Sequence, residues 1–402
     1  MTSLFVTIEQ AIDALKAGRM IILVDDEDRE NEGDLVIAAD FVTPESINFM
    51  SRFGRGLICL PMANELIDRL QLPLMAANNR SPYGTAFTVS IEAAVGVSTG
   101  ISASDRARTV QVAIAPDSKP ADLISPGHVF PLRAKAGGVL VRPGQTEGSV
   151  DLAALAGLTP AAVICEIIND DGTMSRRDEL AVFSRQHDIP MVTVRDLIDY
   201  RIRHEQLIQV AATSSIPMAD FGDFEMTVFD NSLDTAEHFA LVKKPVVSNK
   251  LPLVRVHSEC ITGDVFGSCK CDCGVQLKRS LELLSQEGGI LLYLRQEGRG
   301  IGLANKLKAY ALQDQGHDTV EANLKLGLPA DGRDYAIAYQ MLKYFDIKAL
   351  RLLTNNPKKI ESLEKYGLII SERIPLKVTP SHANRDYLKT KQVKLGHLLA
   401  ID

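Results

Sequence analysis

The sequence has no tryptophan, few aromatic residues and no excess of basic charge. Its 402 residues include 44 lysines and arginines against 51 aspartates and glutamates, and aromatic residues make up 5% of the chain. Proteins that bind nucleic acids usually present a basic face, and those that bind single strands stack bases on aromatic side chains. We therefore expect no nucleic-acid partner.

Long hydrophobic runs are also missing. No apolar stretch approaches the ~18 residues that a membrane-spanning helix needs, and nothing resembles a signal peptide. The six cysteines are clustered rather than spread in pairs, which fits reduced thiols. We expect a cytoplasmic protein with no membrane partner.

The length predicts two domains, because 402 residues exceed what one ordinary core holds. Predicted strands alternate with predicted helices, which indicates an α/β (α+β) class in which each domain is a mixed sheet layered with helices. A capping box at Thr7 and Gln10 predicts a helix over 7–17. A charged helix is predicted over 196–209, and periodicity is lost over 211–221. We expect domains at 1–204 and 205–402.

Four of the six cysteines lie between residues 255 and 274. Cys260, Cys271 and Cys273 can converge on a borderline metal, and zinc is the default because it favours sulfur. Three protein ligands would leave a position for water, as in a catalytic site, whereas Cys269 as a fourth would close a structural one. Free or redox-active cysteines are the third possibility, and the spacing does not choose among them.

An acidic segment at residues 25–34 holds seven carboxylates among ten residues. Like charges at this density repel one another and resist burial unless a cation joins them. A solvated loop is one interpretation. A Mg²⁺ site is the other, since Mg²⁺ takes oxygen ligands and often substrate phosphate.

Two further segments have the composition of phosphate sites. The loop at 295–302, RQEGRGIG, combines backbone N–H groups with two arginines. The segment TNNPKK at 354–359 places two lysines at a predicted helix N-terminus. In the first half, a rigid turn at 125–132 presents His128, and Glu166 lies in an apolar strand, where an acid needs a partner or a function.

The motifs RVHSEC, CDCG, LYLRQEGRGIGL, DTVEAN, DGRDY and TNNPKK follow one another in the second half, which closely resembles GTP cyclohydrolase II. The resemblance implies zinc on Cys260, Cys271 and Cys273, with Cys269 as a neighbour. It implies a proton acceptor in Asp331, a proposed nucleophile in Arg333, and Tyr310 near the reacting base. Charge stabilisation is the competing role for Arg333, because an arginine is rarely deprotonated. The implied GTP contacts are Arg255, Val256, His257, Ser258, Glu259, Gln276, Glu297, Gly298, Arg299, Thr319, Thr354 and Lys359.

The first half resembles 3,4-dihydroxy-2-butanone 4-phosphate synthase through DDEDRENEGDL, GISASDRART, SPGHVFPL and VICEIINDDGTM. The two halves together resemble bifunctional riboflavin-biosynthesis proteins, so the implied substrates are GTP and ribulose 5-phosphate and the implied ions are Zn²⁺ and Mg²⁺. We also expect a homodimer. His128 and Glu166 match the essential catalytic positions, and Glu30 matches a magnesium ligand. The implied ribulose 5-phosphate contacts are Arg29, Glu30, Asp34, Arg142, Pro143, Gly144, Gln145, Thr146 and Glu166.

One departure affects the first half. The family has a metal-binding histidine in an RAGHT turn, and this chain reads RPGQT, with Pro143 and Gln145. An amide oxygen contacts Mg²⁺ more weakly than imidazole in a site built around imidazole. We expect the fold to be kept and the synthase activity to be low. The alternative is that this half is a non-catalytic scaffold or regulator of the cyclohydrolase.

Overall fold

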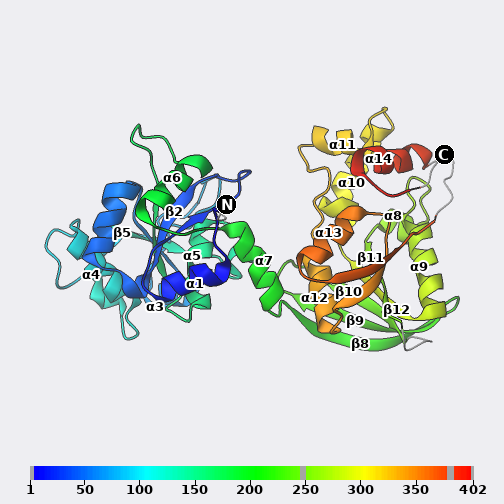
Figure 1. The fold of residues 1–402 in the computed structure, drawn as a ribbon, viewed down its shortest axis with the longest axis horizontal. Coiled ribbons are helices and arrows are strands. Elements are labelled where there is room, and N and C mark those ends of the chain that lie inside the picture. Colours follow the sequence, from blue (N-terminus) through cyan, green and yellow to red (C-terminus); the bar gives the residue numbers. More distant parts are fainter. Residues whose placement is uncertain (1–3, 245–249, 378–383, 400–402) are drawn as a thin grey trace. The chain divides into compact units, whose positions relative to one another are not determined.

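The computed structural model divides the chain into two compact units, Met1–Arg201 and Ile202–Asp402 (Figure 1). It describes residues 4–244, 250–377 and 384–399. The division falls inside helix α7 (Val194–His204), three residues before the expected domain end at 204. Each unit has a seven-stranded mixed sheet with helices, so the predicted fold class is confirmed. No helix in the described ranges is long and apolar enough to cross a membrane.

The first sheet runs in the order β4-β5-β3-β6-β2-β1-β7 and mixes parallel and antiparallel pairs. Its strands are β1 (Ile21–Val24), β2 (Gly33–Ala38), β3 (Cys59–Met62), β4 (Ile91–Ala93), β5 (Leu123–Arg133), β6 (Ala162–Glu166) and β7 (Met191–Thr193). The helices of this unit are α1 (Ile8–Lys16), α2 (Pro44–Phe49), α3 (Asn64–Arg69), α4 (Ala103–Ile114), α5 (Gln145–Leu155) and α6 (Arg177–His187), followed by α7.

The second sheet runs in the order β14-β13-β11-β12-β10-β9-β8. Its strands are β8 (Ile208–Met218), β9 (Gly222–Asn231), β10 (His238–Lys243), β11 (Leu253–Ser258), β12 (Gly289–Leu294), β13 (Ala349–Leu353) and β14 (Ile369–Ile374). Its helices are α8 (Ile261–Asp264), α9 (Cys273–Glu287), α10 (Gly302–Gln313), α11 (Thr319–Lys325), α12 (Ala336–Tyr344), α13 (Pro357–Lys365) and α14 (Arg385–Leu395).

Both sheets are buried on two faces, because alternate residues of the central strands enter different cores. In β1, Ile22 and Val24 join one apolar cluster, while Ile21 and Leu23 join another. In β12, Ile290, Leu292 and Leu294 face one core and Leu291 faces the other. A strand covered on both sides reads as a continuous apolar run, which is why these strands are visible in the sequence.

Two local predictions were wrong. The helix predicted over 196–209 ends at His204, and β8 begins at Ile208. Residues 209–215 of β8 are exposed, so this edge strand shows no apolar alternation. The predicted rigid turn over 125–132 lies instead within the 11-residue strand β5, which includes a cis Ser125–Pro126 bond.

Candidate active site

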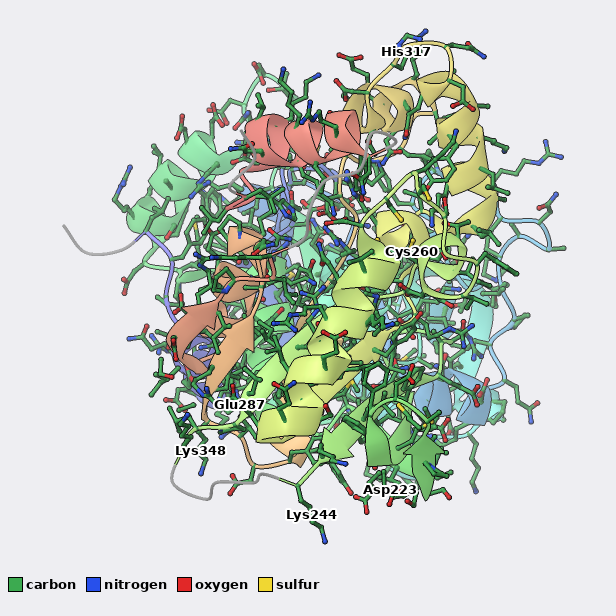
Figure 2. The ribbon with its side chains drawn as sticks, turned by 90° about the vertical axis from the view of Figure 1, so that its right-hand side faces the viewer. Asp223, Lys244, Cys260, Glu287, His317 and Lys348 are labelled. Carbon is green, nitrogen blue, oxygen red and sulfur yellow. The ribbon has the colours of Figure 1, made fainter. Side chains whose placement is uncertain are left out.

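A pocket lies where three parallel strands of the second sheet end. Strand β11 sits between β12 and β13 and is parallel to both. Their carboxyl ends therefore meet at one edge, a common place for ligands in α/β sheets. The segments that follow these strands supply Glu259, Arg299 and Asn355 to the pocket lining. Figure 2 shows Cys260 near the start of α9, with Glu287 at the other end of that helix.

Cys260, Cys271 and Cys273 come together in this pocket. Their sulfur atoms lie within 4.8 Å of one another, and the Cys260 and Cys271 sulfurs are 3.6 Å apart. Cys269 is exposed and outside this group, with its thiol toward the carbonyl of Gly267. Three converging sulfurs are a donor set suited to zinc, so the residues present fit that ion. Among the described residues this is the one such cluster of His, Cys, Asp and Glu side chains.

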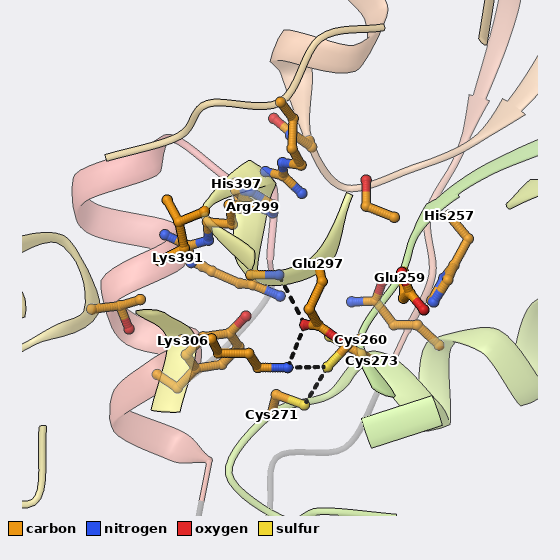
Figure 3. Close-up of a pocket in the computed structure, with 18 of the residues that line it drawn as sticks. His257, Glu259, Cys260, Cys271, Cys273, Glu297, Arg299, Lys306, Lys391 and His397 are labelled. Carbon is orange, nitrogen blue, oxygen red and sulfur yellow. Dashed lines mark hydrogen bonds and ion pairs between the residues drawn. The ribbon is translucent and has the colours of Figure 1, made fainter. Parts of the chain in front are cut away.

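Lys306 from α10 provides a positive charge beside the thiols (Figure 3). Its Nζ lies 3.1 Å from the Cys260 sulfur, 2.8 Å from Glu297 Oε1 and 2.8 Å from Thr262 Oγ1. Hydrogen bonds from Cys271 and Cys273, and then from Lys306, lower the pKa of Cys260. The Cys260 sulfur is thereby favoured as a thiolate, the form that binds metals.

His257 is buried beside the cysteine segment and fixed by Asp264. Its Nε2 lies 3.0 Å from Asp264 Oδ2, which also accepts from the Cys260 backbone N–H at 3.0 Å and from Tyr293 at 2.8 Å. Burial lowers the pKa of His257 despite the carboxylate partner. This network holds the turn between β11 and α8 in place.

Several donors in or beside the pocket have no hydrogen-bond partner within the described residues. Both terminal nitrogens of Arg299 and the Ser258 hydroxyl in the pocket lining, and the Tyr335 hydroxyl beside Lys359, are buried and make no hydrogen bond. Arg299 stands in a left-handed turn, with φ 64°, beside Gly298 at φ 63°. A buried donor without a hydrogen-bond partner raises the free energy of the folded protein, and binding of a ligand can remove this penalty.

Cations dominate the same pocket. Lys359 is buried, and its Nζ donates to the Val256 carbonyl at 2.7 Å. Burial, and then the charges of Arg255 and Arg333, hold the Lys359 pKa well below its usual value. An anion entering here would relieve this repulsion. The cationic side chains that line the pocket are Arg255, Arg299, Lys306, Arg333, Lys359 and Lys391.

Asp331 and Arg333 form a two-point ion pair. Arg333 Nε donates to Asp331 Oδ1 at 2.8 Å, and Nη2 donates to Oδ2. Burial opposes ionisation of Asp331, but hydrogen bonding and charge from Arg333 keep its pKa below the usual value. The pKa of Arg333 is raised by Tyr335 and Asp331 although burial acts in the opposite direction. Asp331 is thus a carboxylate and Arg333 a guanidinium at neutral pH.

The structure brings most predicted residues of this half into one place. Val256 differs, because its side chain is buried in the core and only its carbonyl faces Lys359. Asp331 lies outside the pocket lining and reaches it through Arg333. The predicted residues that line the pocket are Arg255, His257, Ser258, Glu259, Cys260, Cys271, Cys273, Gln276, Glu297, Gly298, Arg299, Tyr310, Thr319, Arg333, Thr354 and Lys359.

Sequence reasoning missed several members of this site. Lys306 and Asp264 carry no motif of their own, and neither was among the expected site residues. Tyr387, Lys391 and His397 come from the C-terminal segment, which holds no phosphate-binding or metal-binding pattern.

In the first unit, one guanidinium joins Glu30, the predicted magnesium ligand, to Gln145, which replaces the family's metal-binding histidine. Arg29 Nη1 lies 2.6 Å from Asp25 Oδ2 and 3.0 Å from Gln145 Oε1, and Nη2 lies 3.1 Å from Glu30 Oε1. The other end of the Gln145 amide donates to the Glu32 carbonyl at 3.4 Å. The amide oxygen of Gln145, at the position of the family's metal-binding histidine, is therefore already paired with a cation.

The acidic residues nearby are crowded. Asp34 on β2 is the register partner of Glu166 on β6, and burial followed by the charge of Glu166 raises the pKa of Asp34 well above its usual value. Burial also raises the pKa values of Glu30 and Glu32. This excess of carboxylates suits a cation, whereas the Gln145 side chain beside it is a poor fit for Mg²⁺.

The remaining predicted residues of this half form separate contacts. His128 Nδ1 lies 2.9 Å from Glu92 Oε1. Glu92 was not among the residues predicted from the sequence. Glu166 Oε2 accepts from the Leu57 backbone N–H at 2.8 Å. The turn before α5 has Arg142 paired with buried Glu147, an exposed Pro143, and Gly144, Gln145 and Thr146 buried.

Fold and site together define a two-domain α/β enzyme whose second domain joins a thiol cluster to a pocket for an anionic substrate. The family model for 3,4-dihydroxy-2-butanone 4-phosphate synthase matches residues 9–200, and that for GTP cyclohydrolase II matches residues 209–375. The chain is 55% identical over 397 residues to riboflavin biosynthesis protein RibBA of Bacillus mycoides, covering 98% of this chain and 100% of that protein. It is 53% identical to RibBA of Synechocystis sp., covering 98% and 72%.

A solved structure is also similar. It is the crystal structure of RibBX, a two-domain 3,4-dihydroxy-2-butanone 4-phosphate synthase from A. baumannii, with 35% identity and a TM-score of 0.70, covering 93% of this chain and all of that one. The chain belongs to the RibBA family of bifunctional riboflavin biosynthesis proteins, with a synthase domain followed by a GTP cyclohydrolase II domain. The resemblance expected from the motifs is confirmed.

Proposed function

We propose that the second half hydrolyses GTP to 2,5-diamino-6-ribosylamino-pyrimidinone 5'-phosphate, formate and pyrophosphate in a zinc-dependent reaction. The observation that carries this proposal is the opening of the three-thiol cluster into a cationic pocket at the ends of β11, β12 and β13. Cys260, Cys271 and Cys273 would hold the zinc. When bound, zinc supplies a Lewis acid and a hydrolytic water that is activated at neutral pH.

The pocket residues support a role in holding the triphosphate. The two terminal nitrogens of Arg299 make no hydrogen bond to any described residue, and Lys359 is a buried cation among other cations. Charge-assisted hydrogen bonds to phosphate oxygens would satisfy both. With Arg255 they would also stabilise the negative charge that develops when pyrophosphate leaves, in which a Mg²⁺ ion carried by the nucleotide would share.

The Asp331–Arg333 pair supports one of the two roles left open for Arg333. Asp331 is ionised and can accept a proton. Arg333 uses Nε and Nη2 to hold Asp331, and its raised pKa keeps the guanidinium protonated. A protonated guanidinium has no lone pair for covalent attack, so stabilisation of charge is the role we propose. Tyr310, whose pKa is raised by burial, would remain a neutral hydrogen-bond donor in the pocket.

For the first half we propose a retained synthase fold with little or no conversion of ribulose 5-phosphate. The Arg29–Gln145 contact supports this, because a metal ion at Gln145 would have to displace a guanidinium. The second candidate, a scaffold or regulator of the cyclohydrolase, is favoured by the same contact. Glu166 and His128, the two predicted catalytic residues, are both present, and each is held by a hydrogen bond to another residue. Their presence argues for residual synthase activity.

The experiment is to assay the purified chain with GTP and with ribulose 5-phosphate in separate reactions and to measure formate in each. Formate from GTP alone is the expected result, and no formate from GTP would overturn the proposed function. A homodimer and a cytoplasmic location are also proposed, and light scattering of the purified protein tests the dimer.

A further inference from the structure

The C-terminal segment contributes a wall of the GTP pocket that the family pattern does not include. The cyclohydrolase model matches residues 209–375, whereas α14 spans Arg385–Leu395. Tyr387 and Lys391 on α14, and His397 just after it, line the pocket. Figure 3 places Lys391 and His397 near Arg299.

Helix α14 is fixed at several points. Lys394 pairs with Asp318, the residue before α11, and lies 2.9 Å from Glu321 in the first turn of that helix. Leu388 is buried, and the backbone N–H of Leu398 donates to the Asn355 carbonyl at 2.8 Å. Asn355 is itself in the pocket lining, so the segment is held on both sides of the site.

Lys391 is the residue of this segment with the most direct link to the site. Its Nζ lies 2.7 Å from Asp272 Oδ1, and the two side chains are 10% and 1% exposed. In the sequence, Asp272 lies between Cys271 and Cys273, two of the three predicted zinc ligands. Its carboxylate also accepts a hydrogen bond from Gln276 Nε2. The opposite atom of that amide, Gln276 Oε1, accepts from Arg255 Nη2 at 2.7 Å.

We infer that Lys391 is a positioning residue for GTP hydrolysis, acting through Asp272 on the Gln276–Arg255 pair; this inference rests on the proposed function. A buried carboxylate without a cation is strongly destabilised. Without Lys391, Asp272 would turn toward other donors or toward water, and its hold on the Gln276 amide would be lost. Gln276 and Arg255 would then no longer be preset for the nucleotide, although neither residue has changed.

The test compares Lys391→Met with Lys389→Met, an exposed lysine on the same helix. Wild-type protein must first release formate from GTP, and its failure would refute the proposed function rather than this inference. For Lys391→Met we expect the KM for GTP to rise at least about tenfold while kcat stays within about threefold, because a binding geometry is lost. Lys389→Met should match wild type. Lys391→Arg, which keeps the charge, should restore most of the affinity.

A double variant keeps the inference testable if Lys391→Met folds poorly. Asp272→Asn removes the carboxylate that Lys391 neutralises, so adding Lys391→Met to it should change KM less than about twofold further. Zinc retained during dialysis against EDTA and the melting temperature are measured for every variant. An unchanged KM in Lys391→Met overturns the inference. So does a loss of melting temperature and kcat that Lys391→Arg does not restore, since that pattern describes a merely structural residue.

Discussion

The two halves treat their predicted metal-binding residues in opposite ways. In the second half, three sulfurs face one another, and the nearest cation, Lys306, stands at the side of Cys260. In the first half, Arg29 contacts both Glu30, the predicted magnesium ligand, and Gln145, which stands in place of the family's second ligand. Both halves are two-sided mixed sheets, so the fold does not make this difference. It arises from how the cations are placed: Lys306 contacts the Cys260 sulfur from one side, whereas Arg29 bridges Glu30 and Gln145.

The two predicted sites also differ in the sign of the charge that they gather. The second site gathers cations, and burial with like charges lowers the pKa of Lys359. The first site gathers carboxylates, and burial with like charges raises the pKa of Asp34. Each cluster is unfavourable by itself and is relieved by a partner of opposite charge. The second site therefore favours an anion such as a triphosphate, and the first site favours a cation.

The largest effect is expected from substitutions in the three-cysteine cluster, with Cys269 outside it as the comparison. Cys260→Ser, Cys271→Ser and Cys273→Ser should each lose bound zinc and lower formate release from GTP by at least about 100-fold, because each removes a donor of the site. Cys269→Ser, whose thiol lies outside the cluster, is the control and should keep both. Metal analysis and a formate assay measure the outcome. Equal zinc loss in Cys269→Ser would indicate a four-cysteine structural site instead.

The next prediction concerns the first half. Formate release from ribulose 5-phosphate with excess Mg²⁺ should be at least about 100-fold below that of a synthase with the usual histidine, because a loosely held ion misplaces the reacting groups. Gln145→His alone should restore little, since Pro143 stiffens the same turn. Gln145→His with Pro143→Ala has the better chance. Rapid conversion of ribulose 5-phosphate by the unmodified chain would contradict this prediction and would show that both halves are active.

A smaller effect is expected at the phosphate loop. Arg299→Ala should weaken GTP binding by ~1.5–3 kcal/mol, the value of a charge-assisted hydrogen bond, and leave guanosine binding nearly unchanged. Arg279→Ala, an exposed residue of α9 paired with Glu282, is the matched control. Calorimetric titration with both ligands decides the matter. Equal losses for GTP and guanosine would place Arg299 away from the phosphates.

The smallest expected effect is on stability. Thr7 Oγ1 accepts from the Gln10 backbone at 3.3 Å, and Gln10 Oε1 accepts from the Thr7 backbone at 3.0 Å. Thr7→Ala should therefore lower the free energy of unfolding of the first unit by ~1 kcal/mol. Because α1 belongs to that unit, GTP hydrolysis should be unchanged. Thermal unfolding and the formate assay test the two statements, and a loss of GTP turnover would contradict the second.

Sequence reasoning succeeded where structure is local or carried by a motif. The capping box at Thr7 and Gln10 depends on residues three apart in the sequence. The central strands can be recognised because each is a continuous apolar run. The cysteine and arginine segments follow the ends of neighbouring strands, so their convergence follows once the strands are parallel. Strand β8 was missed because its exposed residues have no core to face.

What the sequence by itself determined was the order of the elements, the family and the set of residues available for chemistry. Only the tertiary structure decided which of them meet. Lys391 and Asp272 are 119 residues apart, and Arg29 and Gln145 are 116 apart. No periodicity or spacing connects such pairs. Their contacts arise because a buried charge must find an opposite charge or a hydrogen bond, and the partner it finds is fixed by how the helices pack against the sheet.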